Sequence, residues 1–196
     1  PLEVFISRVP LNQLKGKKIG HSSSGVGFSA AVLEHILEQQ GLKLQDITPI
    51  HTKYSLVASL LTGQVDAIIN AYRTYATVDL ERHLNKLYVY SYEDLGIPLF
   101  AAQIVVTNAK VSAQAKIAFQ RALQKACHFL QQNPDKAWEV FRKYRPELDT
   151  PTNHQIWPTV VQLFKVESLP PSEEKHQNLK KFLLKHQLIT TKKGYS

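Results

Sequence analysis

The chain has 196 residues, of which 43% are hydrophobic and 20% charged, so it can form an ordinary packed core. It contains no apolar run approaching the roughly 20 residues of a membrane-spanning helix. The net charge of +8 comes from scattered Lys and Arg without a zinc-ligand spacing or a long basic helix, which disfavours a nucleic-acid-binding protein.

The first half of the chain alternates predicted strands with predicted helices. Apolar residues recur at helical spacing over residues 28–40, where Gly41 ends the helix, and a second short helix is predicted over 55–61. Strand–helix–strand units at this spacing predict an α/β sheet with right-handed crossovers. The predicted strands are Leu2–Ile6, the segment leading to Gly20, Ile47–His51, Val65–Ile69 and Leu87–Tyr90.

After Asn108 every predicted element is a helix. Asn133 and Pro134 fit the N-cap and first turn of one of them. The only cysteine, Cys127, lies in a helical pattern without a partnering histidine motif, so we interpret it as a buried structural thiol. The predicted helices cover residues 112–132, 134–144, 152–165 and 172–187.

A loop of small residues follows the strand at Gly20 and precedes the helix at Phe28. Its backbone N–H groups and serine hydroxyls would converge at a helix N-terminus, which suits an anion or the polar edge of a ligand. An ordinary capped helix start explains the pattern equally well. The loop completes neither a phosphate-binding nor a dinucleotide-binding motif. The candidate ligand-binding residues are Ser22, Ser23, Ser24, Gly25, Val26 and Gly27.

A second candidate segment follows the apolar strand Val65–Ile69 and contains Tyr72, Arg73 and Tyr75. In open α/β sheets, ligands collect at the carboxyl ends of the strands. Tyrosine rings can stack on a ligand and their hydroxyls can form hydrogen bonds, although each ring could instead pack in the core. Arg73 could pair with an anion or face water. We take all three as candidate ligand-binding residues.

The sequence does not predict a catalytic, metal-binding or cofactor-binding residue. The eight histidines lack tight metal-ligand spacing, and no serine lies in a nucleophile-elbow motif. We therefore expect a binding protein rather than an enzyme.

Two longer strings resemble a known family. "LKGKKIGHSSSGVG" and "LVASLLTGQVDAIINAY" resemble segments of type II periplasmic substrate-binding proteins of ABC importers, in the nitrate, sulfonate and taurine group. The pair Ala71–Tyr72, the acidic stretch 79–81, the turn Glu93–Pro98 and the closing "LKKFLLKHQLI" resemble the thiamine-precursor (hydroxymethylpyrimidine) branch of that group. The resemblance spans nearly the whole chain.

This resemblance implies a periplasmic-binding-protein-like (type II) α/β fold. Residues 1–10 would be a hinge strand at the end of lobe one, 11–98 the α/β lobe two, and 99–196 the return crossing with the C-terminal helices of lobe one. The family's receptors are longer, so the chain is expected to be truncated at its N-terminus. A preceding segment or a second chain would then complete lobe one.

The implied function is capture of a small molecule, such as a thiamine pyrimidine precursor, by closure of two lobes. The expected partners are the membrane subunits of an ABC importer, with the receptor periplasmic or extracellular and membrane-anchored. Ala76 and Ala102 stand where the pyrimidine branch is expected to carry acids. One alternative is the effector-binding domain of a transcription regulator. Another is a pyrimidine-precursor synthesis enzyme of related fold, whose expected cysteine- and histidine-rich site a single Cys127 does not provide.

Overall fold

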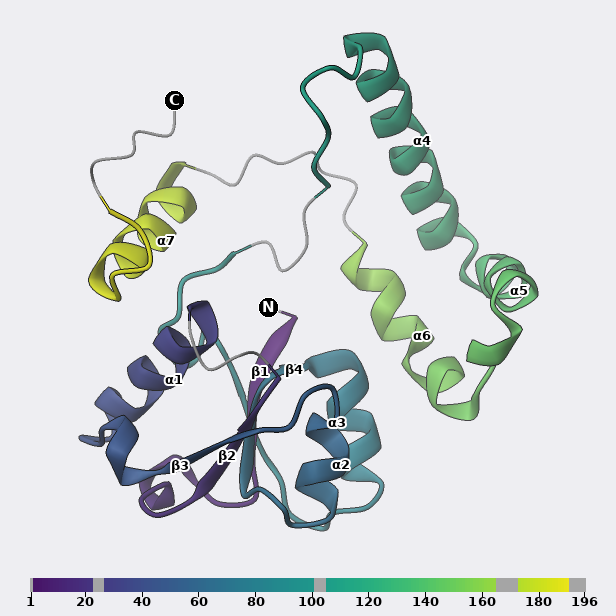
Figure 1. Ribbon diagram of the computed structural model, residues 1–196. Coiled ribbons are helices and arrows are strands. Elements are labelled where there is room, and N and C mark those ends of the chain that lie inside the picture. Colours follow the sequence, from purple (N-terminus) through teal and green to yellow (C-terminus); the bar gives the residue numbers. More distant parts are fainter. Residues whose placement is uncertain (1, 23–26, 101–104, 165–172, 191–196) are drawn as a thin grey trace. The chain divides into compact units, whose positions relative to one another are not determined.

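The computed structural model describes residues 2–22, 27–100, 105–164 and 173–190 (Figure 1). Contacts along the chain divide it into two compact units. The first unit comprises residues 1–102 together with 171–196, and the second comprises residues 103–170. The C-terminal helix thus belongs to the unit that contains the sheet, whereas the sequence led us to group it with the other helices. The lobe boundaries at residues 10 and 98 stay a prediction.

A five-stranded mixed sheet forms the centre of the first unit, in the order β3-β2-β4-β1-β5. β2 pairs in parallel with β3 and β4, and β1 pairs antiparallel with β4 and β5. All five predicted strands are confirmed, with ends that differ from the prediction by up to three residues. The strands are β1 (Glu3–Ser7), β2 (Lys18–His21), β3 (Thr48–His51), β4 (Ala67–Tyr72) and β5 (Tyr88–Ser91).

Helices cover both faces of this sheet (Figure 1). On one face, α1 (Phe28–Gln39) contributes Val32 and Ile36 to a core that also contains Phe182 of α7 (Glu173–Lys185). On the other face, α2 (Leu56–Leu61) and α3 (Arg73–Glu81) pack over β1 and β4. Coverage on both faces explains why the central strands are continuously apolar.

Two helix ends in this unit have identifiable stabilising contacts. Gly41 follows the end of α1 with φ of +69°, the left-handed conformation that the sequence predicted for it. Arg8 donates from Nε to the Leu60 carbonyl oxygen at 2.9 Å and from its terminal nitrogen to the Leu61 carbonyl oxygen at 2.9 Å. These hydrogen bonds satisfy carbonyl oxygens at the C-terminal end of α2 that have no partner within the helix. The positive charge of Arg8 also interacts favourably with the negative end of the helix dipole.

β4 contains a bulge that reverses its side-chain alternation. One residue of β1, Phe5, lies opposite two residues of β4, Ile69 and Asn70. Asn70 has φ of +58°, a left-handed conformation that asparagine tolerates better than most residues. Because of the extra residue, Ile68 and Ala71 both pack on the α2–α3 side, whereas Ile69 packs on the α1 side. The bulge thereby sets the direction in which the end of β4 presents its side chains.

Among the described residues of the sheet-containing unit, α3 is the one α-helix that the sequence did not predict. Only Ala76 and Leu80 of its nine residues are buried. A helix with two buried positions gives too weak an apolar period for recognition from sequence.

All regular secondary structure in the described residues of the second unit, 105–164, is helical, as predicted. Trp138 and Trp157 pack with ring centroids 5.2 Å apart, and Trp157 Nε1 donates to the Pro134 carbonyl oxygen at 2.9 Å. Cys127 is buried, as expected of a structural thiol. Asn133 precedes Pro134 at the start of the second helix, although its side chain makes no capping hydrogen bond. The helices are α4 (Ala113–Gln132), α5 (Pro134–Tyr144) and α6 (Pro151–Leu163).

Candidate functional site

The carboxyl ends of the neighbouring parallel strands β2 and β4 open onto one cavity of about 590 Å³. Ser22 directly follows β2 and Tyr72 ends β4, and both line this cavity. Ser22, the described start of the predicted small-residue loop, and Tyr72 and Tyr75 of the predicted aromatic segment therefore line the same cavity. The lining comprises Ser22, Tyr54, Ser55, Leu56, Val57, Ala58, Leu61, Asn70, Ala71, Tyr72, Tyr75, Ala76 and Asp79.

The β2 side of the site depends on close backbone packing. A Cβ on Gly20 would lie 3.1 Å from a methyl of Thr52 and 3.2 Å from a methyl of Ile68, so only glycine fits without movement of these neighbours. The next residue, His21, stacks on His51 with ring centroids 5.5 Å apart. His51 Nε2 lies 3.2 Å from the carbonyl oxygen of Ser22. These contacts fix the point at which the small-residue loop begins.

The α3 side of the site is aromatic. Tyr72 and Tyr75 are spaced three residues apart and thus lie on one side of the first helical turn. Their side chains are 43% and 48% exposed, so neither tyrosine is a core residue. Tyr54, from the segment before α2, adds a third exposed ring. Exposed rings around a cavity suit the stacking of a flat ligand.

The structure does not bring every predicted site residue into this cavity. Arg73 begins α3, has an exposed side chain, and is not among the described lining residues; its backbone N–H donates to the Leu2 carbonyl oxygen at 2.8 Å. Gly27 forms the N-cap of α1 with φ of +78° and likewise is not part of that lining. The predictions for Ser23, Ser24, Gly25 and Val26 fall outside the described residues.

A polar cluster lies beside the cavity on the β1 side. The Asn70 backbone N–H donates to the Tyr92 hydroxyl oxygen at 3.0 Å, and Asn70 Nδ2 donates to Glu3 Oε2 at 3.0 Å. Asn70 Oδ1 is buried without a hydrogen-bond partner among the described residues. Burial, and secondarily the charge of Glu3, raises the pKa of Tyr92 far above its usual range. Tyr92 is therefore a neutral hydroxyl that holds the bulge of β4 in place.

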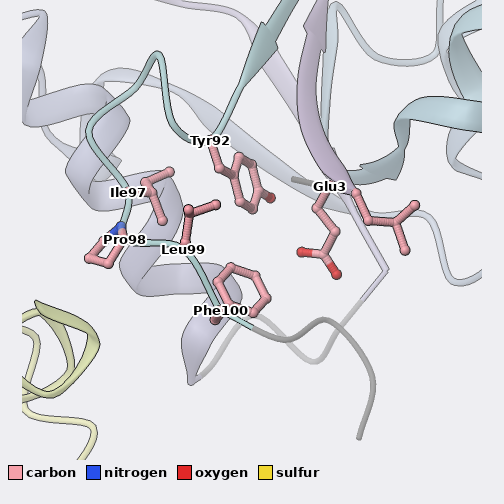
Figure 2. Close-up of a pocket in the computed structure, with 7 residues that line it drawn as sticks. Glu3, Tyr92, Ile97, Pro98, Leu99 and Phe100 are labelled. Atoms are coloured by element: carbon pink, nitrogen blue, oxygen red, sulfur yellow. The ribbon is translucent and has the colours of Figure 1, made fainter. Parts of the chain in front are cut away.

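Figure 2 shows Glu3 across a small cavity from Tyr92, Leu99 and Phe100. The cavity has a volume of about 10 Å³, close to the space that one water molecule needs. It places the start of β1 next to Leu99 and Phe100, the first residues of the predicted return crossing.

Asn70, Asp79 and the segment 54–58 belong to the site but were not predicted from the sequence. Asn70 reads as an ordinary strand residue unless the bulge is known. Asp79 lies four residues after Tyr75, so the same helical face carries both, and recognition of α3 would have revealed it. Ala76, where the resemblance led us to expect an acid, lines the cavity between them.

Among the described residues, no group of three or more His, Cys, Asp or Glu side chains could hold a metal ion. Nor does any helix in the described ranges have the length and apolarity needed to cross a membrane.

Residues 9–137 match the family described as NMT1/THI5 like. The chain belongs to this family. It is 34% identical over 181 residues to a Haemophilus influenzae protein named for thiamine biosynthesis, an alignment that covers 91% of this chain and 57% of the relative.

Two further relatives of this family member carry more specific names. The formylaminopyrimidine-binding protein of Halalkalibacterium halodurans is 23% identical over 146 residues, covering 73% of this chain and 44% of that protein. The 4-amino-5-hydroxymethyl-2-methylpyrimidine phosphate synthase THI5 of Saccharomyces cerevisiae is 24% identical over 155 residues, covering 72% and 44%. The chain thus spans about half the length of the curated relatives it matches.

Solved structures show the fold. The periplasmic aliphatic sulphonate binding protein SsuA of Escherichia coli superimposes with a TM-score of 0.61 at 20% identity, covering 96% of this chain and 61% of that one. The predicted periplasmic-binding-protein-like α/β fold and the predicted resemblance to this class of proteins are confirmed.

Proposed function

We propose that this chain is part of a solute-binding receptor that captures a small molecule for an ABC importer by closure of two lobes. The observation that carries the proposal is the cavity at the carboxyl ends of β2 and β4, where Ser22, Tyr72 and Tyr75 meet. A concave site of about 590 Å³ with apolar walls and a few polar groups has the size and chemistry of a small-molecule site. Closure of a second lobe over it would bury the ligand.

The proposed ligand is a pyrimidine precursor of thiamine. Two relatives carry pyrimidine compounds in their names, as a bound molecule in one and as a product in the other. A pyrimidine ring is flat, and the exposed rings of Tyr54, Tyr72 and Tyr75 offer stacking surfaces of matching size.

The proposed receptor needs further polypeptide to form its second lobe. The chain spans 57% of the Haemophilus influenzae relative. The helices of the second unit expose large apolar side chains, which a lobe-one sheet would cover. That sheet would come from a preceding segment or a separate chain, and the assembled receptor would deliver its ligand to importer membrane subunits outside the cytoplasm. The exposed apolar side chains include Ile117, Phe119, Leu123, Phe129 and Val140.

Titration calorimetry with 4-amino-5-hydroxymethyl-2-methylpyrimidine tests this proposal on the protein that contains this chain. Tyr72→Ala removes a stacking surface and should weaken binding about tenfold, which corresponds to about 1.4 kcal/mol. Tyr144→Ala is the matched control because Tyr144 is 83% exposed and lies in the second unit. Unchanged affinity of Tyr72→Ala would remove the tyrosine from the site. The receptor proposal would then lose its main support.

The second candidate function is an enzyme of pyrimidine-precursor synthesis, because a relative is named as a synthase. The receptor is the better fit to the cavity: its described lining contains Asp79, Ser22 and Ser55, but no His or Lys that would activate a serine hydroxyl. Mass spectrometry of the pyrimidine after prolonged incubation separates the two functions. A receptor returns the molecule unchanged, whereas appearance of a phosphorylated or otherwise altered product would favour the enzyme.

A further inference from the structure

We infer that Glu3 is a positioning residue for the proposed binding site: its carboxylate holds Asn70 and thereby fixes the segment 70–72 beside the cavity. Glu3 is not among the described residues that line that cavity, so it acts through Asn70 rather than by touching the ligand. This role rests on the proposed receptor function and adds to it a residue outside the cavity.

The start of β1 runs directly alongside the segment that carries the site. Glu3 lies opposite Tyr72 in the register of β1 and β4, and the Leu2 carbonyl oxygen accepts the Arg73 backbone N–H at 2.8 Å. All three residues of the segment 70–72 line the cavity. A side chain at the start of β1 is therefore close enough to control how this segment is held.

The bulge makes Asn70 depend on contacts outside the regular strand pairing. Its left-handed conformation, with φ of +58°, interrupts the register between β1 and β4. Two hydrogen bonds hold the residue instead: the Tyr92 hydroxyl oxygen accepts its backbone N–H, and Glu3 Oε2 accepts from its Nδ2, each at 3.0 Å. Tyr92 thus anchors the backbone of Asn70, and Glu3 anchors its side chain.

Glu3 is itself held in a partly buried position. It lines the small cavity of Figure 2 together with Tyr92, Leu99 and Phe100. A carboxylate partly withdrawn from water needs a hydrogen-bond donor, and Asn70 Nδ2 supplies one. A hydrogen bond to a carboxylate in such surroundings is stronger than a neutral one in water, so it can fix the Asn70 side chain.

Titration calorimetry with 4-amino-5-hydroxymethyl-2-methylpyrimidine tests this role on the protein that contains this chain, well below the Tm of every variant. Glu3→Leu removes the acceptor and should weaken binding about tenfold, because the segment 70–72 is no longer held in place. Glu3→Gln keeps an oxygen acceptor and should restore the affinity to within about twofold of wild type. Leu37→Val is the matched control: it lowers stability from the buried C-terminal end of α1 and should leave the affinity unchanged.

Two readouts separate positioning from a purely structural role. In an Asn70→Gly background, which keeps the left-handed backbone, Glu3→Leu should cause no further loss of affinity because the amide that Glu3 holds is gone. In isotope-labelled protein studied by NMR, Glu3→Leu should shift the amide resonances of Ala71 and Tyr72, and Glu3→Gln should leave them near their wild-type positions. The resonance shifts require no ligand.

Glu3→Leu with wild-type affinity, or with the same loss of affinity in the Asn70→Gly background, overturns the positioning role while the receptor proposal stands. Glu3→Gln binding as weakly as Glu3→Leu overturns it as well, because loss of charge alone would then explain the effect. If the wild type binds no pyrimidine, the proposed ligand fails and the resonances decide the role of Glu3. An unshifted Tyr72 amide in Glu3→Leu then overturns that role, and a shift that Glu3→Gln reverses supports it.

Discussion

The substitution Tyr92→Phe isolates the hydrogen bond that anchors the β4 bulge. Tyr92 is 1% exposed, and its hydroxyl oxygen accepts the Asn70 backbone N–H at 3.0 Å. Phenylalanine keeps the ring packing but leaves this N–H without its acceptor, which costs about 1–3 kcal/mol. For a chain of this length each kcal/mol lowers Tm by about 2–4 °C, so a loss of about 2 kcal/mol lowers Tm by about 4–8 °C.

The same variant should change the response to alkaline pH. Burial raises the pKa of Tyr92 in the folded state above its ordinary value of 10.0, so folding favours the neutral hydroxyl. This contribution to stability is fully present below pH 10 and is lost as the pH rises above it. Wild-type protein should therefore lose stability above pH 10 more steeply than Tyr92→Phe.

Urea denaturation followed by circular dichroism at pH 7 and at pH 10.5 measures both effects. Tyr144→Phe is the control, because Tyr144 is 83% exposed and outside the cluster. A Tyr92→Phe variant with the wild-type midpoint at pH 7 and the same alkaline loss would refute the assignment of Tyr92 as the anchor of the bulge.

Two further predictions concern the bulge and the contact between α1 and α7. Asn70→Ala forces alanine into a left-handed conformation and should be about 1 kcal/mol less stable than Asn70→Gly in chemical denaturation; equal stabilities would argue against the bulge. Burial, then the charge of Lys185, lowers the pKa of His35 below 6.5 in the folded state, so stability is full above pH 6.5 and falls as the pH drops below it. His35→Gln should lose less Tm than wild type between pH 7.5 and pH 5, and an identical loss would contradict this reasoning.

Most elements of the first unit were predictable because each has a recognisable local pattern of apolar residues in the sequence. Val65 to Ile69 is a largely apolar segment of strand length that follows a glycine-terminated helix, and its four apolar residues are buried. The helix α1 buries Val32, Leu33, Ile36 and Leu37, the same positions that repeat at helical spacing in the sequence. Local apolar periodicity therefore sufficed for most elements.

Strand direction could not be read in the same way. β1 is as apolar as its neighbours, yet it runs in the direction opposite to the other four strands of the described sheet. A continuous hydrophobic pattern indicates that a strand is buried on both faces. It does not indicate which neighbour the strand pairs with, or in which direction. The position of α7 next to α1 likewise depends on contacts such as Lys185 with Glu38, which are 147 residues apart in the sequence.

The candidate site was predictable where it follows strand ends and unpredictable where it depends on the bulge. Ser22 and Tyr72 follow β2 and β4 directly, so the rule for open α/β sheets placed them. Asn70 required the register between β1 and β4, which no local pattern encodes. Asp79 required knowledge of α3, whose apolar period is too short to recognise.

Asn70 connects the stability of the β4 bulge with the shape of the cavity. Its backbone N–H is held by Tyr92, its amide nitrogen is held by Glu3, and the same residue lines the cavity. A residue in a left-handed conformation inside a strand costs free energy that a sequence optimised for stability alone would avoid. The bulge turns the end of β4 so that Asn70, Ala71 and Tyr72 all reach one cavity. The strain at Asn70 is therefore best understood as the local cost of forming the binding surface, offset by the buried hydroxyl of Tyr92.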